Sequence, residues 1–182
     1  MSACKHIVRP AANADIPALS AMQERSMWVL GAGYYAPEVI AAFMSEIGTM
    51  DEAVVAEGHY FIACDRRGAF LGSGGWSQLV PGYARNAPKG ALAPNTATVR
   101  SVFVDAAAAR QGVGTAIMDR VEADARLHGM TLLRLAATLS GVPFYRALGY
   151  CPRGRRHFML STGARFECLE MEKPLASLRA AV

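Results

Sequence analysis

Residues 110–115 read Arg-Gln-Gly-Val-Gly-Thr, and this glycine-rich segment constrains the fold more than any other part of the chain. It follows residues 97–105, whose β-branched and aromatic side chains predict a strand. It leads directly into residues 115–128, whose apolar positions have helical spacing. Glycine tolerates the backbone angles of a tight turn and leaves no Cβ in the way of a close approach. The pattern therefore predicts a strand, a tight turn and a helix within an α/β domain.

A helix that begins at such a turn offers free N–H groups and a partial positive charge to an anion. Gly112 and Gly114 would let a phosphate approach those groups, and Arg110 adds a permanent positive charge beside them. A bare turn would have the same glycines, so the interpretation depends on the strand before the segment and the amphipathic helix after it. We expect this segment to bind phosphate.

Other phosphate-binding and hydrolytic motifs fit the sequence less well. A Rossmann loop would have a third glycine where this chain has Ile117, and it normally opens a series of strand–helix repeats. The chain contains no GxxxxGK[ST] segment, so P-loop nucleotide hydrolysis is not indicated. It also contains no GxSxG and no HExxH, the signatures of serine hydrolases and zinc proteases.

The other elements are predicted from periodicity and from turn residues. We expect strands at residues 5–9, 59–64, 69–79, 97–105, 131–137, 157–160 and 165–171. We expect one helix starting at Asn13 or Asp15, others at 38–47 and 115–128, and a short one capped by Ser140. Residues 28–35 are expected to be a glycine-broken aromatic segment, and residues 80–96 a long loop. This order predicts an α/β fold with a mixed sheet of about seven strands and four helices.

Length and composition indicate one globular domain. A chain of 182 residues with 52% apolar and 19% charged residues can bury a core, which we place at about residues 5–175 of a single domain spanning 1–182. No apolar stretch approaches the roughly 20 residues that span a bilayer, and the N-terminus lacks a signal-peptide core. We therefore expect a soluble, cytoplasmic protein without a membrane partner.

Charge and cysteine content narrow the partners further. The net charge of +4 suits an anionic partner, but the basic residues form no long run, so nucleic-acid binding is the weakest expectation. Arg153, Arg155 and Arg156 form the densest basic cluster, where we expect a turn that is either solvated or in contact with phosphates or an acidic substrate. The cysteines are far apart and form no CxxC pair, so reduced, mostly buried thiols are expected and neither a disulfide framework nor a metal site; they are Cys4, Cys64, Cys151 and Cys168.

Two motifs resemble the signatures of the GNAT superfamily of N-acetyltransferases. Residues 102–105 with 110–117 resemble its central motif, and residues 142–150 resemble its second signature, an aromatic pair followed by leucine, glycine and an aromatic residue. The element order also matches, so the resemblance covers nearly the whole chain. The family pattern places Gln or Arg at the position of Ala109, so one side-chain contribution to phosphate binding is missing here. The backbone N–H groups, which form most of the phosphate site, are unaffected.

The resemblance implies that acetyl-CoA lies where two central parallel strands splay apart. Its pantetheine arm would pair with the backbone of Val102, Phe103 and Val104, like an added strand. Its pyrophosphate would contact Arg110, Gln111, Gly112, Val113, Gly114 and Thr115, and Thr138 would lie near the cofactor. Tyr145 matches the family's general acid, which protonates the departing CoA thiolate. A phenol with a pKa near 10 can pass a proton to a thiolate whose conjugate acid is near 8.5. Without the resemblance, a packing aromatic residue would be the favoured interpretation of Tyr145.

The general base and the acceptor are left open by the sequence. An amine with a pKa of about 10.4 is protonated at pH 7, and neutralising it costs roughly 4–5 kcal/mol. The candidates for the base are Glu46, Glu57, His59, His157 and Glu170, and ordered water could also accept the proton. Residues 27–35, 80–96 and 153–157 are expected to set acceptor specificity. Trp28, Tyr34 and Tyr35 could form an apolar acceptor wall or simply fill the core.

Two functions are therefore carried forward. The first is an N-acetyltransferase that moves an acetyl group from acetyl-CoA to a primary amine, on a small molecule, by direct attack. The second is a non-catalytic acyl-CoA-binding or sensing module on the same fold, suggested by Ala109 and by the missing base. A homodimer is common among relatives, although no sequence feature demands one.

Overall fold

The computed structural model describes residues 6–79 and 92–176, and its centre is a seven-stranded sheet. The strands are β1 (Ile7–Pro10), β2 (Tyr60–Cys64), β3 (Phe70–Ser77), β4 (Thr96–Val104), β5 (Leu132–Thr138), β6 (Cys151–Met159) and β7 (Arg165–Pro174). They are ordered β1-β2-β3-β4-β5-β7-β6. Every neighbouring pair is antiparallel except β4 and β5, which are parallel. The predicted mixed α/β sheet is confirmed.

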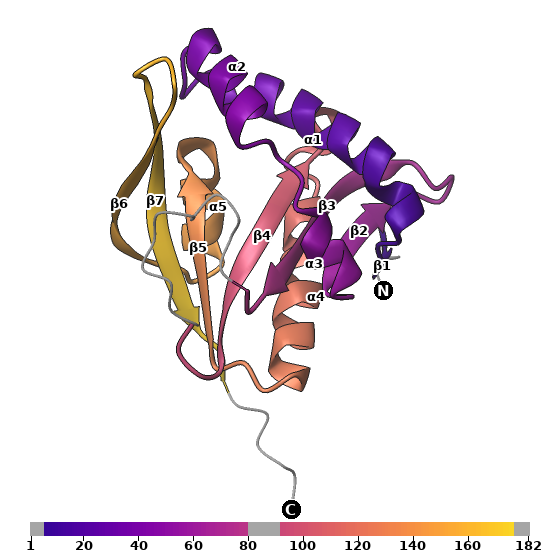
Figure 1. Ribbon diagram of the computed structural model, residues 1–182. Helices are drawn as coiled ribbons and strands as arrows, with labels where there is room; N and C mark the ends of the chain where they lie inside the picture. Colours follow the sequence, from indigo (N-terminus) through magenta and orange to yellow (C-terminus); the bar gives the residue numbers. More distant parts are fainter. Residues whose placement is uncertain (1–5, 80–91, 177–182) are drawn as a thin grey trace, which may run out of the picture.

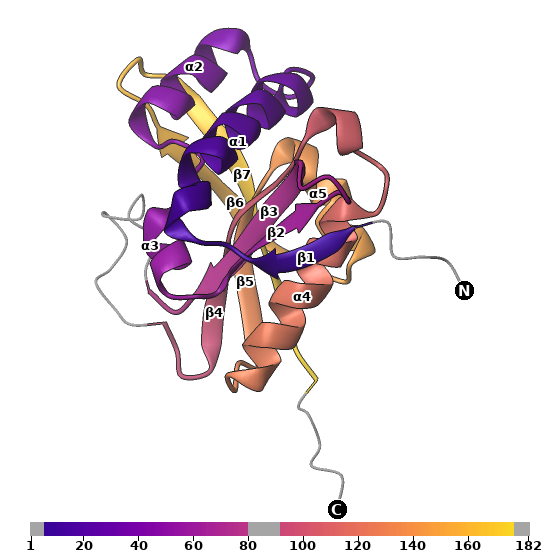
Figure 2. The same ribbon diagram turned by 90° about the vertical axis from the view of Figure 1, so that its right-hand side faces the viewer.

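Helices cover both faces of the sheet (Figures 1 and 2). They are α1 (Ile16–Gly31), α2 (Pro37–Glu46), α3 (Glu52–Ala56), α4 (Val113–Leu127) and α5 (Val142–Ala147). The buried strand β2 shows why there are two layers, because its side chains alternate between two separate cores. Phe61 and Ala63 pack into the core under α4 and α5, whereas Tyr60, Ile62 and Cys64 face α1 and α3.

The central strands β4 and β5 separate after a short common stretch, as Figure 1 shows. Their parallel pairing covers only Thr96 to Thr98 of β4, opposite Leu132 to Arg134 of β5. Strand β5 stays paired with β7 along its whole length, whereas β4 bends away with a bulge at Ser101. Ser101 has a φ of 47°, and its carbonyl accepts a hydrogen bond of 2.7 Å from the Tyr60 hydroxyl. The predicted splay of the central parallel strands is therefore confirmed.

Several element boundaries differ from the sequence expectation. Helix α1 continues through residues 28–31, which we expected to be irregular, and its last residue Gly31 is buried, where a Cβ would lie 3.3 Å from Met27 Cε. Helix α3 was not predicted, since five residues are too few to show a helical period, and it brings the described α-helices to five rather than four. Helix α4 begins at Val113, two residues before the predicted start, with Gly112 as its N-cap.

Two further expectations near the C-terminal half were wrong. Strand β6 begins at Cys151, so Arg153, Arg155 and Arg156 lie within a strand and not in a turn. This strand is at the edge of the sheet and pairs only with β7, so polar side chains are tolerated on it and hide the strand pattern. Ser140 does not cap α5; it lies in a short 3-10 turn, and its hydroxyl lies 3.1 Å from the Thr138 hydroxyl.

The described cysteines agree only in part with the expectation of mostly buried thiols. Cys64 and Cys168 are buried free thiols, Cys151 is exposed, and Cys4 lies outside the described residues. Within residues 6–79 and 92–176, none of the helices combines the length and the apolar character needed to cross a bilayer.

Candidate functional site

A cleft of about 790 Å³ occupies the space where β4 and β5 separate. Its wall on the β4 side is formed by residues 99–104, the part of the strand that β5 no longer covers. The cleft reaches both faces of the sheet, because it is lined by Val113 and Phe144 from the α4 and α5 layer and by Met27 and Phe43 from the α1 and α2 layer. Two molecules could therefore enter it from opposite sides and meet at the splayed strands.

One end of the cleft is the turn before α4, which has the geometry of an anion site. Arg110 and Gly112 both have left-handed backbone angles, with φ of 62° and 83°. The first N–H groups of α4 have no carbonyl within the helix to bond, and they follow Gly112 at the cleft. Asp105 shapes the approach, because its carboxylate accepts a hydrogen bond of 2.9 Å from Ala107 N.

Nine of the ten residues expected around the cofactor line this cleft: Val102, Phe103, Val104, Arg110, Gly112, Val113, Gly114, Thr115 and Thr138. Gln111 is the exception. Its side-chain amide donates a hydrogen bond of 2.9 Å to the carbonyl of Ala107, and the residue does not line the cleft. Ala109, at the position where the family has Gln or Arg, does line it.

Two glycines of β3 allow α4 to lie close to the sheet, a role that the sequence did not reveal. A Cβ on Gly72 would lie 2.8 Å from the Phe103 carbonyl oxygen and 2.9 Å from Ile117 Cδ1. A Cβ on Gly74 would lie 2.8 Å from Val102 Cγ2 and 3.0 Å from Ile117 Cγ2. Side chains at either position would push α4 away, so these glycines fix the height of the N-terminal end of α4 above β4.

Tyr145 lies in the wall of the cleft on α5 and is 8% exposed. Its ring meets the edge of the Tyr150 ring, with centroids 5.6 Å apart. Gly141, one turn earlier, allows this position, because a Cβ there would be 3.3 Å from Tyr145 Cε2. Thr138, at the end of β5, lines the same region of the cleft.

The opposite side of the cleft is mostly apolar. It is lined by Met27, Leu30, Tyr34, Phe43, Ile47, Phe158 and Phe166. Cys168 also lies here, and burial raises the pKa of its thiol to about 12. Of the three aromatic residues considered for an acceptor wall, only Tyr34 lines the cleft, and Trp28 does not.

Tyr35 has a structural role beside this apolar wall. Its ring stacks on Phe166 with centroids 4.3 Å apart. Its hydroxyl donates a hydrogen bond of 2.7 Å to the Glu167 carbonyl and accepts one of 2.8 Å from Leu139 N. Burial raises the pKa of this hydroxyl above its ordinary range. Tyr35 therefore holds the connection between α1 and α2 against β7.

The charges along the described cleft lining are positive. They belong to Arg110 and to Arg100, which is 3% exposed on β4. Arg100 donates to the carboxylate of Asp51 and to the carbonyl of Leu79, while its Nε has no partner. No sequence pattern indicates this pair, because the two residues are 49 positions apart.

None of the five candidates for the general base lines the cleft. Glu46 accepts hydrogen bonds from Ser161, Glu57 accepts one from Ser77, and Glu170 pairs with Arg156. His59 lies beside Asp124 and His157 is exposed on β6; indeed no Asp, Glu or His is found among the cleft residues that the structure describes.

Comparison with known proteins agrees with this geometry. Residues 56–152 match the family model described as an acetyltransferase (GNAT) domain, and no curated protein matches the chain. A GCN5-related N-acetyltransferase from Rhodopseudomonas palustris is 23% identical, with a TM-score of 0.72 over 96% of this chain and 99% of that one. A phosphinothricin acetyltransferase from Sinorhizobium meliloti, solved with acetyl-CoA, is 20% identical, with a TM-score of 0.65 over 95% and 90% of the two chains.

A third similar structure contains bound coenzyme A. This protein, the PaiA N-acetyltransferase from Thermoplasma acidophilum in complex with coenzyme A, is 14% identical to the chain. Its TM-score is 0.67, and the match covers 94% of this chain and 99% of that one. At these identities the solved structures establish a common fold.

Proposed function

The chain belongs to the GNAT acetyltransferase family, and from this premise we propose that it transfers the acetyl group of acetyl-CoA to a primary amine. The observation that carries the proposal is the cleft between β4 and β5, which joins an anion site at one end to Tyr145 in its wall. Acetyl-CoA is the co-substrate, and the similar structures solved with acetyl-CoA or coenzyme A support this assignment.

The chain's own backbone would hold most of the cofactor. The pyrophosphate would accept hydrogen bonds from N–H groups of residues 112–115, and Arg110 would add charge beside it. The pantetheine arm would pair with the uncovered edge of β4 at residues 102–104. Thr138 would face the arm from the end of β5. This arrangement needs no side chain at Ala109, where the family usually has a polar residue.

The reaction would be a direct attack of the amine nitrogen on the thioester carbonyl. A C–N bond forms, the C–S bond breaks, and the departing thiolate takes a proton from the hydroxyl of Tyr145. The proton of the attacking amine would pass to water, since none of the cleft residues that the structure describes is an acid or a histidine. Water entering from the open side of the cleft would later return a proton to Tyr145.

The acceptor would enter from the α1 and α2 side, where the lining is apolar. We propose a small amine with an apolar body, because contact with Phe43, Phe158 and Phe166 removes apolar surface from water. Two arginines and no described carboxylate in the lining disfavour an acceptor that carries several positive charges.

The test follows thiol release from acetyl-CoA in the presence of a panel of small amines. With an amine that supports turnover, Tyr145→Phe should lower kcat by about 100-fold or more, the usual size of a lost general acid. Binding of acetyl-CoA, measured by titration calorimetry, should stay within about threefold of the wild type, because the anion site is untouched. The matched control is Tyr150→Phe, which removes a buried hydroxyl outside the cleft lining and should retain the wild-type rate. Full activity of Tyr145→Phe would remove Tyr145 from the mechanism.

A second function is supported by one observation, the lack of an acid or histidine among the described cleft residues. On this alternative the chain binds acyl-CoA without turning it over and acts as a sensing module. The same experiment separates the two functions: acetyl-CoA would raise the Tm by mass action, with no thiol release for any amine in the panel.

A further inference from the structure

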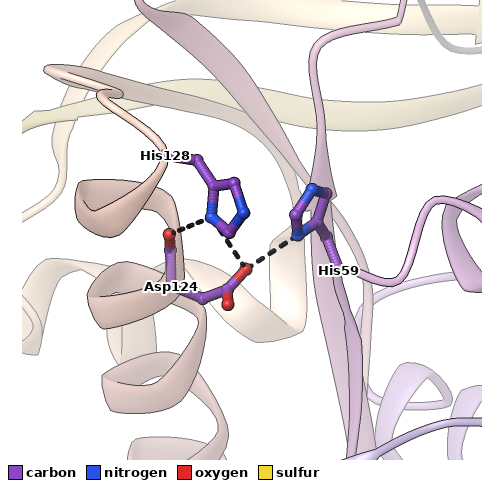
Figure 3. Close-up of side chains that lie close together, drawn as sticks. All are labelled: His59, Asp124 and His128. Carbon is purple, nitrogen blue, oxygen red and sulfur yellow. Dashed lines mark hydrogen bonds and ion pairs between the residues drawn. The ribbon is translucent and has the colours of Figure 1, made fainter.

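Three side chains that could bind a metal ion lie close together at the C-terminal end of α4, the end opposite the proposed anion site (Figure 3). This cluster consists of His59, just before β2, with Asp124 and His128 on the last turn of α4. His59 Nδ1 lies 2.8 Å from Asp124 Oδ2, and His128 Nδ1 lies 3.8 Å from the same oxygen. One ligand atom from each residue falls within 4.8 Å of the others. Figure 3 shows both imidazole rings beside the carboxylate of Asp124, with a dashed line from each ring to a carboxylate oxygen.

Trp76 of β3 holds this cluster from behind. Its indole Nε1 donates a hydrogen bond of 2.9 Å to Asp124 Oδ2, and its ring stacks on the His59 ring with centroids 4.1 Å apart. The ring of His128 meets the edge of His59 at 4.5 Å. Asp124 is buried, whereas the side chain of His128 is 50% exposed. The carboxylate is thus oriented by a neighbour, and the cluster opens to solvent on the His128 side.

We propose that His59, Asp124 and His128 bind a divalent transition-metal ion, with Zn²⁺ as the best fit. Two imidazoles and one carboxylate are ligands that zinc commonly takes, with water completing a tetrahedral site. The donation from Trp76 to the carboxylate is the kind of outer contact that orients metal ligands. A cation is also favoured at this end of α4 by the negative end of the helix dipole.

The geometry needs only a small rearrangement to close around an ion. Ligands at about 2.0–2.1 Å from zinc lie no more than about 4 Å from one another, whereas the atoms here spread to 4.8 Å. His128 is the C-cap residue of α4 and half exposed, so its ring can move by this amount without disturbing the core. Asp124 and His128 are four residues apart on one helix, which keeps both ligands on the same face.

The rival explanation is a hydrogen-bonded network that ties the start of β2 to α4 without any ion. In its favour, His59 already contacts the carboxylate, and Arg120 Nη2 lies 4.0 Å from the other oxygen of Asp124 and would repel a cation. The His128 ring belongs to this network too, because its Nδ1 donates a hydrogen bond of 2.8 Å to the Asp124 carbonyl, so Nε2 is the nitrogen left to bind an ion. The role of His128 therefore decides between the two.

The experiment uses the full chain without an affinity tag and ZnCl₂ as the probe. Titration calorimetry should give one ion per chain, and the Tm should rise by at least about 3 °C at saturating ZnCl₂ because the ion binds only the folded cluster. His128→Ala should weaken binding at least tenfold and abolish the Tm shift, while its Tm without zinc stays near that of the wild type. His157→Ala removes an exposed histidine of β6 and should bind zinc as the wild type does.

Cobalt provides a readout of the ligand type. Co²⁺ bound by imidazole and carboxylate should give visible absorption without the near-ultraviolet band of a thiolate ligand, and His128→Ala should lose that absorption. The proposal is overturned if 1 mM ZnCl₂ leaves the wild-type Tm unchanged. It is equally overturned if His128→Ala binds zinc as tightly as the wild type, or if the cobalt spectrum shows thiolate ligation, which would point to the exposed Cys151.

Discussion

The ring of Phe144 lies directly against the backbone of Gly114: a Cβ on this glycine would be 3.0 Å from Phe144 Cζ and 3.1 Å from Cε2. Gly114 belongs to the first turn of α4, and Phe144 immediately precedes Tyr145 on α5. The contact therefore links the proposed anion site to the proposed acid. The second glycine of the loop serves helix packing as well as the approach of a phosphate.

Gly114→Ala should raise the KM for acetyl-CoA by roughly threefold to tenfold, because the new methyl displaces the Phe144 ring and with it α5. Stability should change little, since alanine is favoured over glycine by about 1 kcal/mol within a helix and offsets part of the crowding. Steady-state kinetics and thermal melting measure the two effects. The double variant Gly114→Ala/Phe144→Leu should recover most of the wild-type KM, and a failure to recover would contradict the packing explanation.

Gly112→Ala should weaken acetyl-CoA binding, and Gly129→Ala provides its matched control. The two glycines flank α4 and have φ of 83° and 79°, and a Cβ on either would meet nothing within 4 Å. Each substitution should cost about 1 kcal/mol of stability, because a Cβ disfavours the left-handed region. Only Gly112→Ala should lower the affinity for acetyl-CoA in calorimetry, by about tenfold, since only Gly112 adjoins the proposed anion site. Equal effects of the two variants on affinity would argue against that site.

The parts of the fold that the sequence predicted are those carried by local patterns. The strand, glycine turn and helix at residues 97–128 were recognisable because the spacing of apolar residues changes at Gly112, from that of a strand to that of a helix. The position of Tyr145 in the cleft could be expected only through the resemblance, since nothing in its immediate neighbourhood distinguishes it from a packing residue. Its role as an acid stays a prediction.

The parts that escaped prediction depend on contacts between distant segments. Arg100 meets Asp51 across 49 residues, and His59 meets Asp124 across 65, so neither pair has a spacing that a sequence can reveal. The arginines of β6 resemble a turn in the sequence because an edge strand that pairs on one side need not alternate apolar and polar residues. Helix α3 was missed because its five residues are shorter than two turns.

Asp15→Asn should destabilise the protein at neutral pH and have little effect in acid. Arg9 donates two hydrogen bonds, of 2.8 and 2.9 Å, to the Asp15 carboxylate, and these bonds lower the pKa of that carboxyl. A lowered folded-state pKa stabilises the fold above the unfolded value near 4, and the contribution is lost as the pH falls through the folded value. The variant should lose about 1 kcal/mol at pH 7, because one partner of the pair is exposed. Urea unfolding at pH 7, 5 and 3 measures the difference, which should shrink toward pH 3. Asp119→Asn, at an exposed position of α4, is the matched control for the substitution itself.

Asp51→Asn should cost more stability than Arg100→Met, although both substitutions break the same ion pair at the cleft. The side chain of Arg100 is 3% exposed and that of Asp51 is 25% exposed, so loss of the carboxylate leaves a buried cation without a counter-charge. Loss of the arginine leaves a carboxylate that water can still reach, and methionine fills much of the vacated space. We expect about 2 kcal/mol for Asp51→Asn and less than half of that for Arg100→Met. The double variant should lie near Arg100→Met, because the uncompensated charge is then absent. Urea unfolding of the three variants tests this order, and a larger cost for Arg100→Met would show instead that the hydrogen bond from Arg100 to the Leu79 carbonyl dominates.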